Sequence, residues 1–312
     1  MDIFTVGSYN DLNPEIKSMI DSAEPLANDS SSIAVKYQEA TRFIAESSQL
    51  YLLFDWNFHQ LTDGIRITEN DILLSADGKT GELDYRITVN GYTINLVSSG
   101  INFIQALEAF PNHIEADKQN HFDSFHSFRS CKFDQDVLYA LFYSMRNFAQ
   151  HQQLLVSIHR DNDEYRACFD LDQLSNPILY SMKSKESGIL QKLKEMLAAY
   201  SASPLRLGYC YSIDRFNLTV RSIYNAFLNS LAQYAEDLRN EMKRSFFLHP
   251  KAFFSLPNGE RAAVYYSENA CHILTNLEHD PVDAIHNQQS DLDEQIKRAE
   301  AQLSVYTFRR DK

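Results

Sequence analysis

The sequence predicts a mostly α-helical protein, and three observations support this fold class. Glycine and proline are scarce, at 9 and 8 residues of 312, whereas barrels and sandwiches need many tight turns. Apolar residues recur at a spacing near 3.6 along several stretches, which indicates one buried face of a helix. Hydrophobic residues make up 44% of the chain, enough for a sizeable core. The length favours one large domain with elaborations, or two packed units.

An N-terminal extension is expected over residues 1–91. Residues 33–61 carry apolar side chains at helical spacing and predict a long helix. Residues 64–90 change character, because short apolar runs alternate on either side of the turn signal Asp77-Gly78. We therefore predict a helix followed by a small β-hairpin or meander.

The central residues, 92–247, predict a four-helix bundle. Bundling is the economical way for helices of this length to bury their apolar faces. The expected helices cover about residues 94–110, 134–153, 179–200 and 214–247. A polar connection, either without regular structure or with a short helix, is expected over residues 111–133, and a loop over residues 159–174.

The C-terminal extension, residues 248–312, is predicted to end in an amphipathic helix. An extended piece is expected near residues 262–266, and a helix near residues 268–277. In the last helix, residues 290–306, an apolar stripe follows one face. That stripe is either docked on the body of the protein or a surface for a partner.

The charge balance excludes a protein that coats nucleic acid through a general basic surface. The net charge is −13, whereas non-specific binding to phosphates needs an excess of Lys and Arg. Residues 183–244 alone are net basic, with 10 basic and 6 acidic side chains. Any contact with nucleic acid is therefore expected to be local.

Metal, disulfide and membrane classes find no support in the sequence. The four cysteines lie far apart, and the spacing of His113, His121 and His126 matches no standard set of metal ligands. The N-terminus lacks the pattern of a signal peptide, and no apolar run approaches the ~18 residues of a membrane helix. We expect a cytoplasmic protein without a metal or another cofactor.

The most informative segment runs from Arg146 to His151, at the end of an apolar helical run. The Arg146 guanidinium is permanently charged and fork-shaped, which suits a phosphate. His151 carries the side chain whose unperturbed pKa, roughly 6.5, suits a general base near neutral pH. Asn147 lies four residues before His151, on the same helix face, and can orient the imidazole or contact the substrate. A second Arg-to-His copy, Arg244 to His249, abuts Pro250 and reads as a chance match.

Five residues on an ideal helix put Arg146 and His151 about 140° apart. One helix alone does not make them converge, so either the long Arg side chain swings round or a two-fold axis brings a second copy opposite. A catalytic site of this kind is therefore expected to be composite, built by a homodimer. Cleavage of RNA without a metal requires a base to remove the proton of a 2′-OH, which His151 can do. Because the attacking 2′-OH belongs to the RNA itself, the expected product of such a site is a 2′,3′-cyclic phosphate.

The string Met145-Arg146-Asn147-Phe148-Ala149-Gln150-His151, preceded by its helical run and by residues 94–103, resembles the HEPN superfamily. The likeness covers roughly residues 92–200, and its most specific element is the R-N-x-x-x-H form of the family's R-x(4-6)-H signature. It implies a four-helix bundle that dimerises, with Arg146, Asn147 and His151 in the site. It implies a metal-independent endoribonuclease that acts on RNA in a toxin–antitoxin or anti-phage system, with an antitoxin or regulatory protein as a further partner.

Several alternatives stay open. Family members without catalysis serve as RNA-binding or protein-binding modules, which the acidic net charge also suits. Tyr143 either lines the cleft and stacks on a base or belongs to the core or rim. Lys183 and Lys185 either hold RNA phosphates beside the cleft or lie on a solvated helix face. A third reading is a scaffold protein that works through residues 1–91 and the C-terminal stripe.

Overall fold

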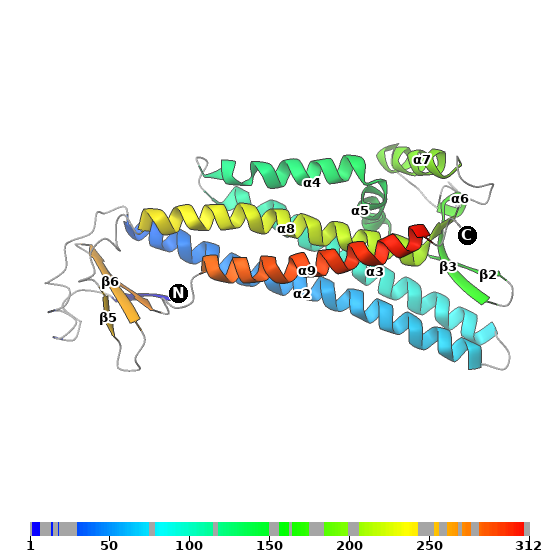
Figure 1. The fold of residues 1–312 in the computed structure, drawn as a ribbon, viewed down its shortest axis with the longest axis horizontal. Coiled ribbons are helices and arrows are strands. Elements are labelled where there is room, and N and C mark those ends of the chain that lie inside the picture. Colours follow the sequence, from blue (N-terminus) through cyan, green and yellow to red (C-terminus); the bar gives the residue numbers. More distant parts are fainter. Residues whose placement is uncertain are drawn as a thin grey trace. The chain divides into compact units, whose positions relative to one another are not determined.

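The computed structural model is mostly helical, which confirms the predicted fold class (Figure 1). The residues that it describes are 2–6, 14, 18, 30–74, 79–114, 118–149, 156–161, 164–174, 184–198, 206–242, 253–255, 261–267, 270–275 and 281–308.

The chain divides into two compact units, each made of segments that are distant in sequence. The first unit comprises Met1–Ser47, His113–Asp123 and Phe227–Asp291, and the second comprises Ser48–Asn112, Ser124–Ala226 and Leu292–Lys312. The predicted domain boundary at Gly91 falls inside a helix, whereas the predicted boundary at residue 247 lies outside the described residues.

Helices dominate the described part of the chain. In chain order they are α2 (Ser30–Leu74), α3 (Lys79–Ala109), the short 3-10 turns Phe110–His113 and Gln119–Phe122, α4 (Asp123–Gln135), α5 (Val137–Ala149), α6 (Leu171–Leu174), α7 (Ser184–Ala198), α8 (Tyr209–Met242) and α9 (Pro281–Phe308).

The predicted β-hairpin at residues 64–90 is wrong, because the described residues of this segment belong to α2 and α3. Ile65 is buried four residues after buried Leu61, so it continues the apolar stripe of α2. Tyr85 and Val89 are likewise buried four residues apart, while Ile87 between them is 56% exposed. Burial thus follows the helical period, although the sequence also suits an alternating strand.

Aromatic rings from three helices, α2, α5 and α8, pack together in the core of the second unit. Phe216 of α8 contacts Phe54 of α2 and Phe142 of α5, with ring centroids 6.3 and 5.0 Å apart. Gly100 of α3 lets the helices approach closely here, since a Cβ at this position would lie 3.0 Å from the Phe216 ring and 3.1 Å from that of Phe54. This core fixes α3 and α5 as neighbours.

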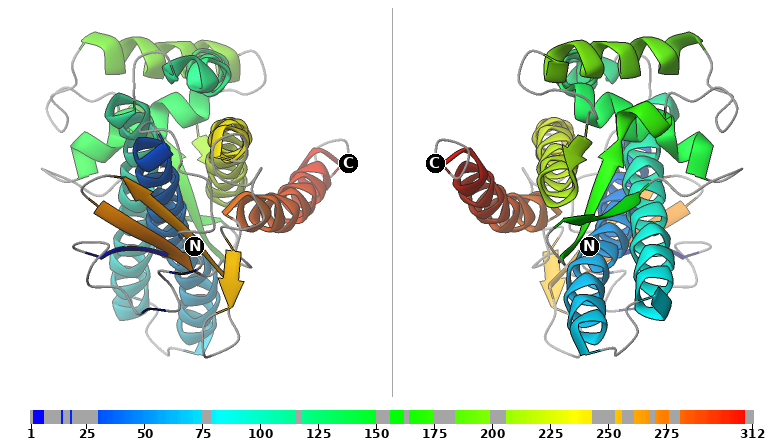
Figure 2. Two further views of the ribbon diagram at one scale, coloured as in Figure 1. Left: turned by 90° about the vertical axis from the view of Figure 1, so that its left-hand side faces the viewer. Right: turned by 90° about the vertical axis from the view of Figure 1, so that its right-hand side faces the viewer.

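A small sheet in the second unit replaces the loop predicted over residues 159–174. Strands β2 (Ser157–Asp161), β3 (Glu164–Asp170) and β4 (Arg206–Gly208) pair antiparallel in the order β2-β3-β4, and α6 follows β3 directly (Figure 2). Phe169 of β3 is fully buried and packs on Phe142, with ring centroids 5.3 Å apart. The sheet therefore rests on α5, the helix that carries the predicted motif.

The first unit contains a four-stranded antiparallel sheet of order β1-β7-β6-β5. Its strands are β1 (Asp2–Val6), β5 (Phe253–Ser255), β6 (Arg261–Ser267) and β7 (Ala270–Thr275). Strand β6 confirms the expected extended piece, whereas the helix predicted near residues 268–277 is wrong. Strand β7 lies between β1 and β6 and pairs with both, which stabilises the extended conformation.

Helical segments of the first unit share a second aromatic contact set. Phe227 of α8 lies 5.7 Å from Phe43 and 5.6 Å from Phe122, measured between ring centroids. The same unit holds an ion pair between Lys118 and Glu241, and Nε2 of His121 lies 3.2 Å from the Asp237 carboxylate. His121, one of the three histidines considered above as metal ligands, is thus paired with a carboxylate.

The apolar stripe of α9 is docked within the second unit. Ala299 and Leu303 form a buried cluster with Leu218 of α8, and Ile296 packs against it. Of the two readings of this stripe, the structure shows the docked one for these residues. Tyr306, the last residue of the stripe, has a side chain outside the described set.

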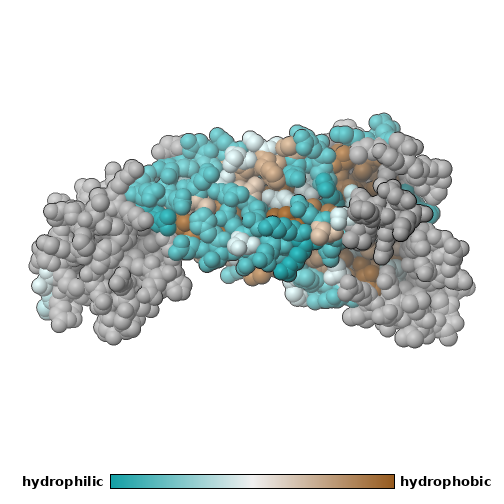
Figure 3. Space-filling model, in the orientation of Figure 1, coloured by the Kyte–Doolittle hydropathy of each residue, from teal (hydrophilic) through white to brown (hydrophobic). Residues whose placement is uncertain are grey.

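Hydrophilic residues cover most of the described surface that faces the viewer in Figure 3, with smaller apolar areas between them. Among the described helices, none combines the length and the apolar character that crossing a membrane requires.

Candidate functional site

Helix α5 begins at a break that Asp136 creates between two helices. The Asp136 carboxylate accepts a hydrogen bond from the Tyr139 backbone N–H at 3.2 Å, which caps the new helix. The same carboxylate pairs with Arg215 and accepts from the Thr219 hydroxyl. Helix α5 accounts for most of the described part of the helix predicted over residues 134–153, whereas α4 occupies residues 123–135, most of which lie in the predicted polar connection. The motif begins one turn before the end of α5.

Arg146 lies in the last turn of α5 and reaches across to α3. Its Nη1 donates to Oε1 of Gln105 at 2.9 Å, and its Nη2 donates to Oδ1 of Asn102. The two acceptors are three residues apart on α3 and so share one helix face. The guanidinium fork is held by two neutral amides.

No carboxylate forms an ion pair with Arg146 within the described part of the chain. The other buried or half-buried arginines described all have such a partner: Arg129 with Glu108, Arg215 with Asp136, Arg221 with Asp55, and Arg239 with Glu236. Amide oxygens satisfy N–H donors without cancelling their charge. Arg146 therefore keeps a full positive charge on a half-buried side chain.

The Nε–H of Arg146 is buried and has no hydrogen-bond partner within the described part of the chain. Leaving a buried donor unsatisfied costs about 1–3 kcal/mol. The Nε–H groups of Arg129 and Arg239 share this feature, so Arg146 is distinguished by having no carboxylate partner among the described residues and not by its open donor.

Tyr143 lies one turn before Arg146 and belongs to the same network. Its hydroxyl accepts a hydrogen bond from Nε2 of Gln105 at 3.3 Å. Its ring packs edge-on against Phe133, 5.5 Å between centroids, and the Arg129 guanidinium carbon lies 5.5 Å from its centroid. These contacts make Tyr143 a support for Gln105, while the predicted contact with a base stays a prediction.

Arg129, a charged side chain next to Tyr143, forms an ion pair with Glu108. Arg129 lies 2.5 Å from Glu108, and burial raises the pKa of this carboxyl although Arg129 opposes the shift. Burial also raises the pKa of Tyr139, so its phenol stays protonated at neutral pH. Glu108 balances the charge of Arg129, so among the described residues around Tyr143 the charge of Arg146 is the one without a carboxylate partner.

Other predicted site residues fall largely outside the description. Asn147 lies on α5 and Lys185 on α7, but their side chains are not among those described, and His151 and Lys183 lie outside the described residues altogether. The convergence of Arg146 and His151 therefore stays a prediction. Among the described residues, no three His, Cys, Asp or Glu side chains group as metal ligands.

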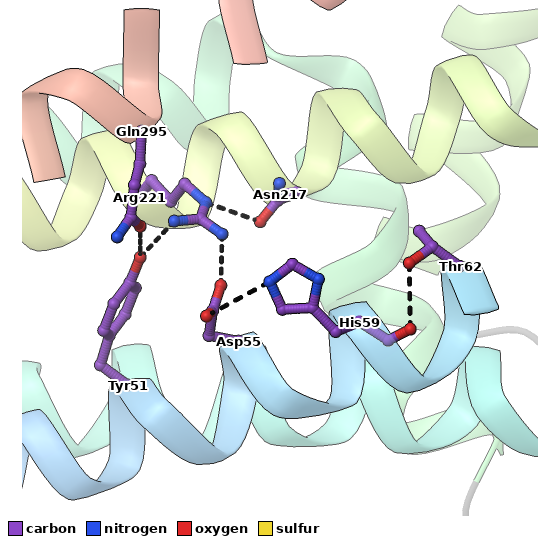
Figure 4. Close-up of polar contacts among 7 residues, drawn as sticks. All are labelled: Tyr51, Asp55, His59, Thr62, Asn217, Arg221 and Gln295. Carbon is purple, nitrogen blue, oxygen red and sulfur yellow. Dashed lines mark hydrogen bonds and ion pairs between the residues drawn. The ribbon is translucent and has the colours of Figure 1, made fainter. Parts of the chain in front are cut away.

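A second arginine cluster of the same unit shows a different arrangement (Figure 4). Arg221 of α8 is 6% exposed; it donates from Nη2 to Asp55, from Nη1 to the Tyr51 hydroxyl and from Nε to Asn217 at 3.0 Å. Tyr51 donates in turn to Gln295 of α9, and His59 lies 3.6 Å from Asp55. Every nitrogen of this guanidinium has an acceptor, and its charge is balanced.

Asn102 and Gln105 were not predicted as site residues. The only signal in the sequence is that two amides interrupt the apolar pattern of α3 at a spacing of one turn, beside buried Phe103 and Ile104. Comparison of the chain with protein-family models, curated proteins and solved structures finds no match. The site is therefore argued from its own geometry.

Proposed function

We propose that this protein is a metal-independent endoribonuclease in which Arg146 binds the scissile phosphate. The observation that carries the proposal is the guanidinium held in place by two neutral amides, with no carboxylate partner within the described part. Such a group attracts an anion and stabilises charge that develops on phosphate oxygens.

His151 is the proposed general base that removes the 2′-OH proton, and Asn147 supports it. The 2′-oxygen attacks the adjacent phosphorus, the 5′-oxygen of the next nucleotide leaves with a proton, and a 2′,3′-cyclic phosphate results. A positioned general base contributes about 10²–10⁴-fold to the rate. The bond rearrangement needs no metal and no second substrate.

The finer architecture that belongs to this proposal is a HEPN-like bundle that pairs with a second copy. The helices of this bundle would come from residues 92–247. Helix α5 would carry the motif, and α3 would carry the two amides that accept hydrogen bonds from Arg146. A cytoplasmic role in phage defence or a toxin–antitoxin system, with a cognate antitoxin or regulator, follows from the family resemblance. Lys183 and Lys185 are proposed to extend the phosphate contacts.

Cleavage of total RNA in the presence of EDTA tests the proposal directly. Wild type should release fragments with 2′,3′-cyclic phosphate ends, and His151→Ala should lose at least about 100-fold in rate. His249→Ala, in the second Arg-to-His copy, is the matched control and should cleave normally. Absence of cleavage by wild type, or full activity of His151→Ala, would refute the proposal.

Complementation tests whether the site is composite. When Arg146→Ala and His151→Ala subunits are mixed, a composite site regains one intact Arg and His pair in each mixed dimer. A site built within one chain stays broken in every combination. Recovered cleavage in the mixture, absent from either variant alone, is the expected result, and a strictly monomeric particle by native mass would contradict it.

A non-catalytic HEPN-like module that binds RNA or a partner protein is the second candidate, and the net charge of −13 suits a partner protein better than RNA. In that case Arg146→Ala weakens RNA binding while wild type yields no fragments under any condition. Cleavage by the wild type and RNA binding by Arg146→Ala therefore separate the candidates.

A further inference from the structure

We infer that Asn102 contacts the RNA phosphate beside Arg146, through an amide N–H that has no hydrogen-bond partner among the described residues. This inference rests on the proposed function, because it names a second donor of the same site. It assigns different roles to the two amides of α3, although both accept from the same guanidinium.

The orientation of each amide follows from the chemistry of its partner. A guanidinium carries donors only, so the amide oxygen must face it and the amide NH2 must face away. This holds for Gln105 Oε1 at 2.9 Å from Nη1 and for Asn102 Oδ1 beside Nη2.

The two NH2 groups then have different surroundings. In Gln105, Nε2 donates to the Tyr143 hydroxyl, so both ends of a half-buried side chain are bonded. Asn102 is exposed, and its Nδ2 has no hydrogen-bond partner among the described residues. Gln105 is thus a positioning residue, whereas Asn102 presents an unused donor.

The unused donor lies next to the uncompensated charge. The Asn102 carboxamide is hydrogen-bonded to Nη2 of Arg146, so its own N–H groups lie within one side chain's width of that guanidinium. Phosphate has several acceptor oxygens, and protein contacts to it combine charged and neutral donors. A guanidinium and an adjacent amide N–H form a two-donor clamp for one phosphate.

The two kinds of donor differ in their response to salt. A cation that contacts a phosphate releases a counterion, and for single strands each such contact adds about 0.7 to the slope of log K against log salt. A neutral amide adds affinity without changing that slope. Salt dependence therefore distinguishes direct contact by Asn102 from a role in holding Arg146.

The test measures binding of a fluorescent, single-stranded 2′-O-methyl RNA, which cannot be cleaved by 2′-OH attack, across a salt series. Asn102→Ala should weaken binding roughly tenfold with an unchanged slope. Arg146→Ala should weaken binding and make the slope of log K against log salt less steep by about 0.7. Asn95→Ala, which changes an exposed asparagine two turns away on α3, is the matched control and should bind as wild type does.

Three results would overturn the inference. Wild-type affinity of Asn102→Ala would show that the amide contacts no phosphate, and a lowered slope in this variant would show that it acts only by holding Arg146. Failure of the wild type to bind RNA at all would remove both the inference and the proposed function. Binding without cleavage of natural RNA would refute the ribonuclease alone and leave the clamp in place. Circular dichroism of each variant confirms that it is folded.

Discussion

Two arginine clusters of the second unit, around Arg146 and around Arg221, differ in whether a carboxylate balances the charge of the guanidinium. Arg221 is 6% exposed, has acceptors on all three nitrogens and pairs with Asp55. Arg146 is half-buried, and among the described residues it is held by amides alone and has one buried donor without a partner. A charge that is fully balanced serves the fold, whereas a charge that is held but not balanced is available to a ligand.

The largest expected effect is on stability, at the balanced cluster. Arg221→Ala leaves Asp55 without its partner beside Tyr51, and breaking such a pair costs about 3–5 kcal/mol. Denaturant unfolding should show this loss. Arg42→Ala removes an exposed pair with Glu46, 81% and 51% exposed, and should change stability by no more than about 0.5 kcal/mol. Equal losses of stability in Arg221→Ala and Arg42→Ala would show that the buried Arg221 cluster contributes no more to the fold than an exposed pair does.

The conservative substitution Asp55→Asn makes the Arg221 cluster resemble the Arg146 cluster. Asp55→Asn keeps an acceptor for Arg221 but leaves the guanidinium charge uncompensated in a buried place. We expect a loss of about 2 kcal/mol in the free energy of unfolding, less than for Arg221→Ala. Wild-type stability of this variant would show that amides balance a buried arginine as well as a carboxylate does.

At the unbalanced cluster the expected loss is in binding and not in stability. Arg146→Ala should weaken RNA binding by about 10- to 100-fold, as expected for a charged hydrogen bond. Its free energy of unfolding should change by less than about 1 kcal/mol, because the side chain is half-buried and incompletely bonded. Thermal unfolding checks this, and a loss as large as that of Arg221→Ala would assign Arg146 to the fold.

The smallest effect concerns alkaline pH. Burial raises the pKa of Tyr51, although Arg221 opposes the shift. The folded state therefore keeps a proton that the unfolded state loses above pH ~10, and stability should fall as pH rises beyond that point. Tyr51→Phe should flatten this decline relative to wild type. An unchanged decline in the variant would assign it to other groups, such as Tyr209, whose pKa burial also raises.

Features that depend on local interactions can be predicted from the sequence, whereas features that depend on distant contacts are missed. The helical class and the position of α5 follow from apolar spacing, and Arg146 is found because its motif is contiguous. The strand β7 is missed because it depends on β1, from the other end of the chain, and on β6. Residues 64–90 are missed because a short apolar run fits both a period of two and a period of 3.6.

The same limit applies to the site. The acceptors of Arg146 lie 41 and 44 residues before it, and two amides on an apolar helix carry no signature by themselves. Their role emerges only when packing brings α3 beside α5. The predicted partners His151 and Lys183 lie outside the described residues, so their place in the site rests on the sequence.

Gln105→Glu tests the central claim most directly, because it adds a carboxylate next to Arg146 with almost no change in shape. If the uncompensated charge binds phosphate, RNA affinity should fall roughly tenfold, and the slope of log K against log salt should become less steep by about 0.7. The free energy of unfolding should stay the same or rise. The substitution keeps the acceptor for Arg146, and the Tyr143 hydroxyl can donate to the new carboxylate. Wild-type affinity and an unchanged slope in this variant would show that the charge of Arg146 plays no part in binding.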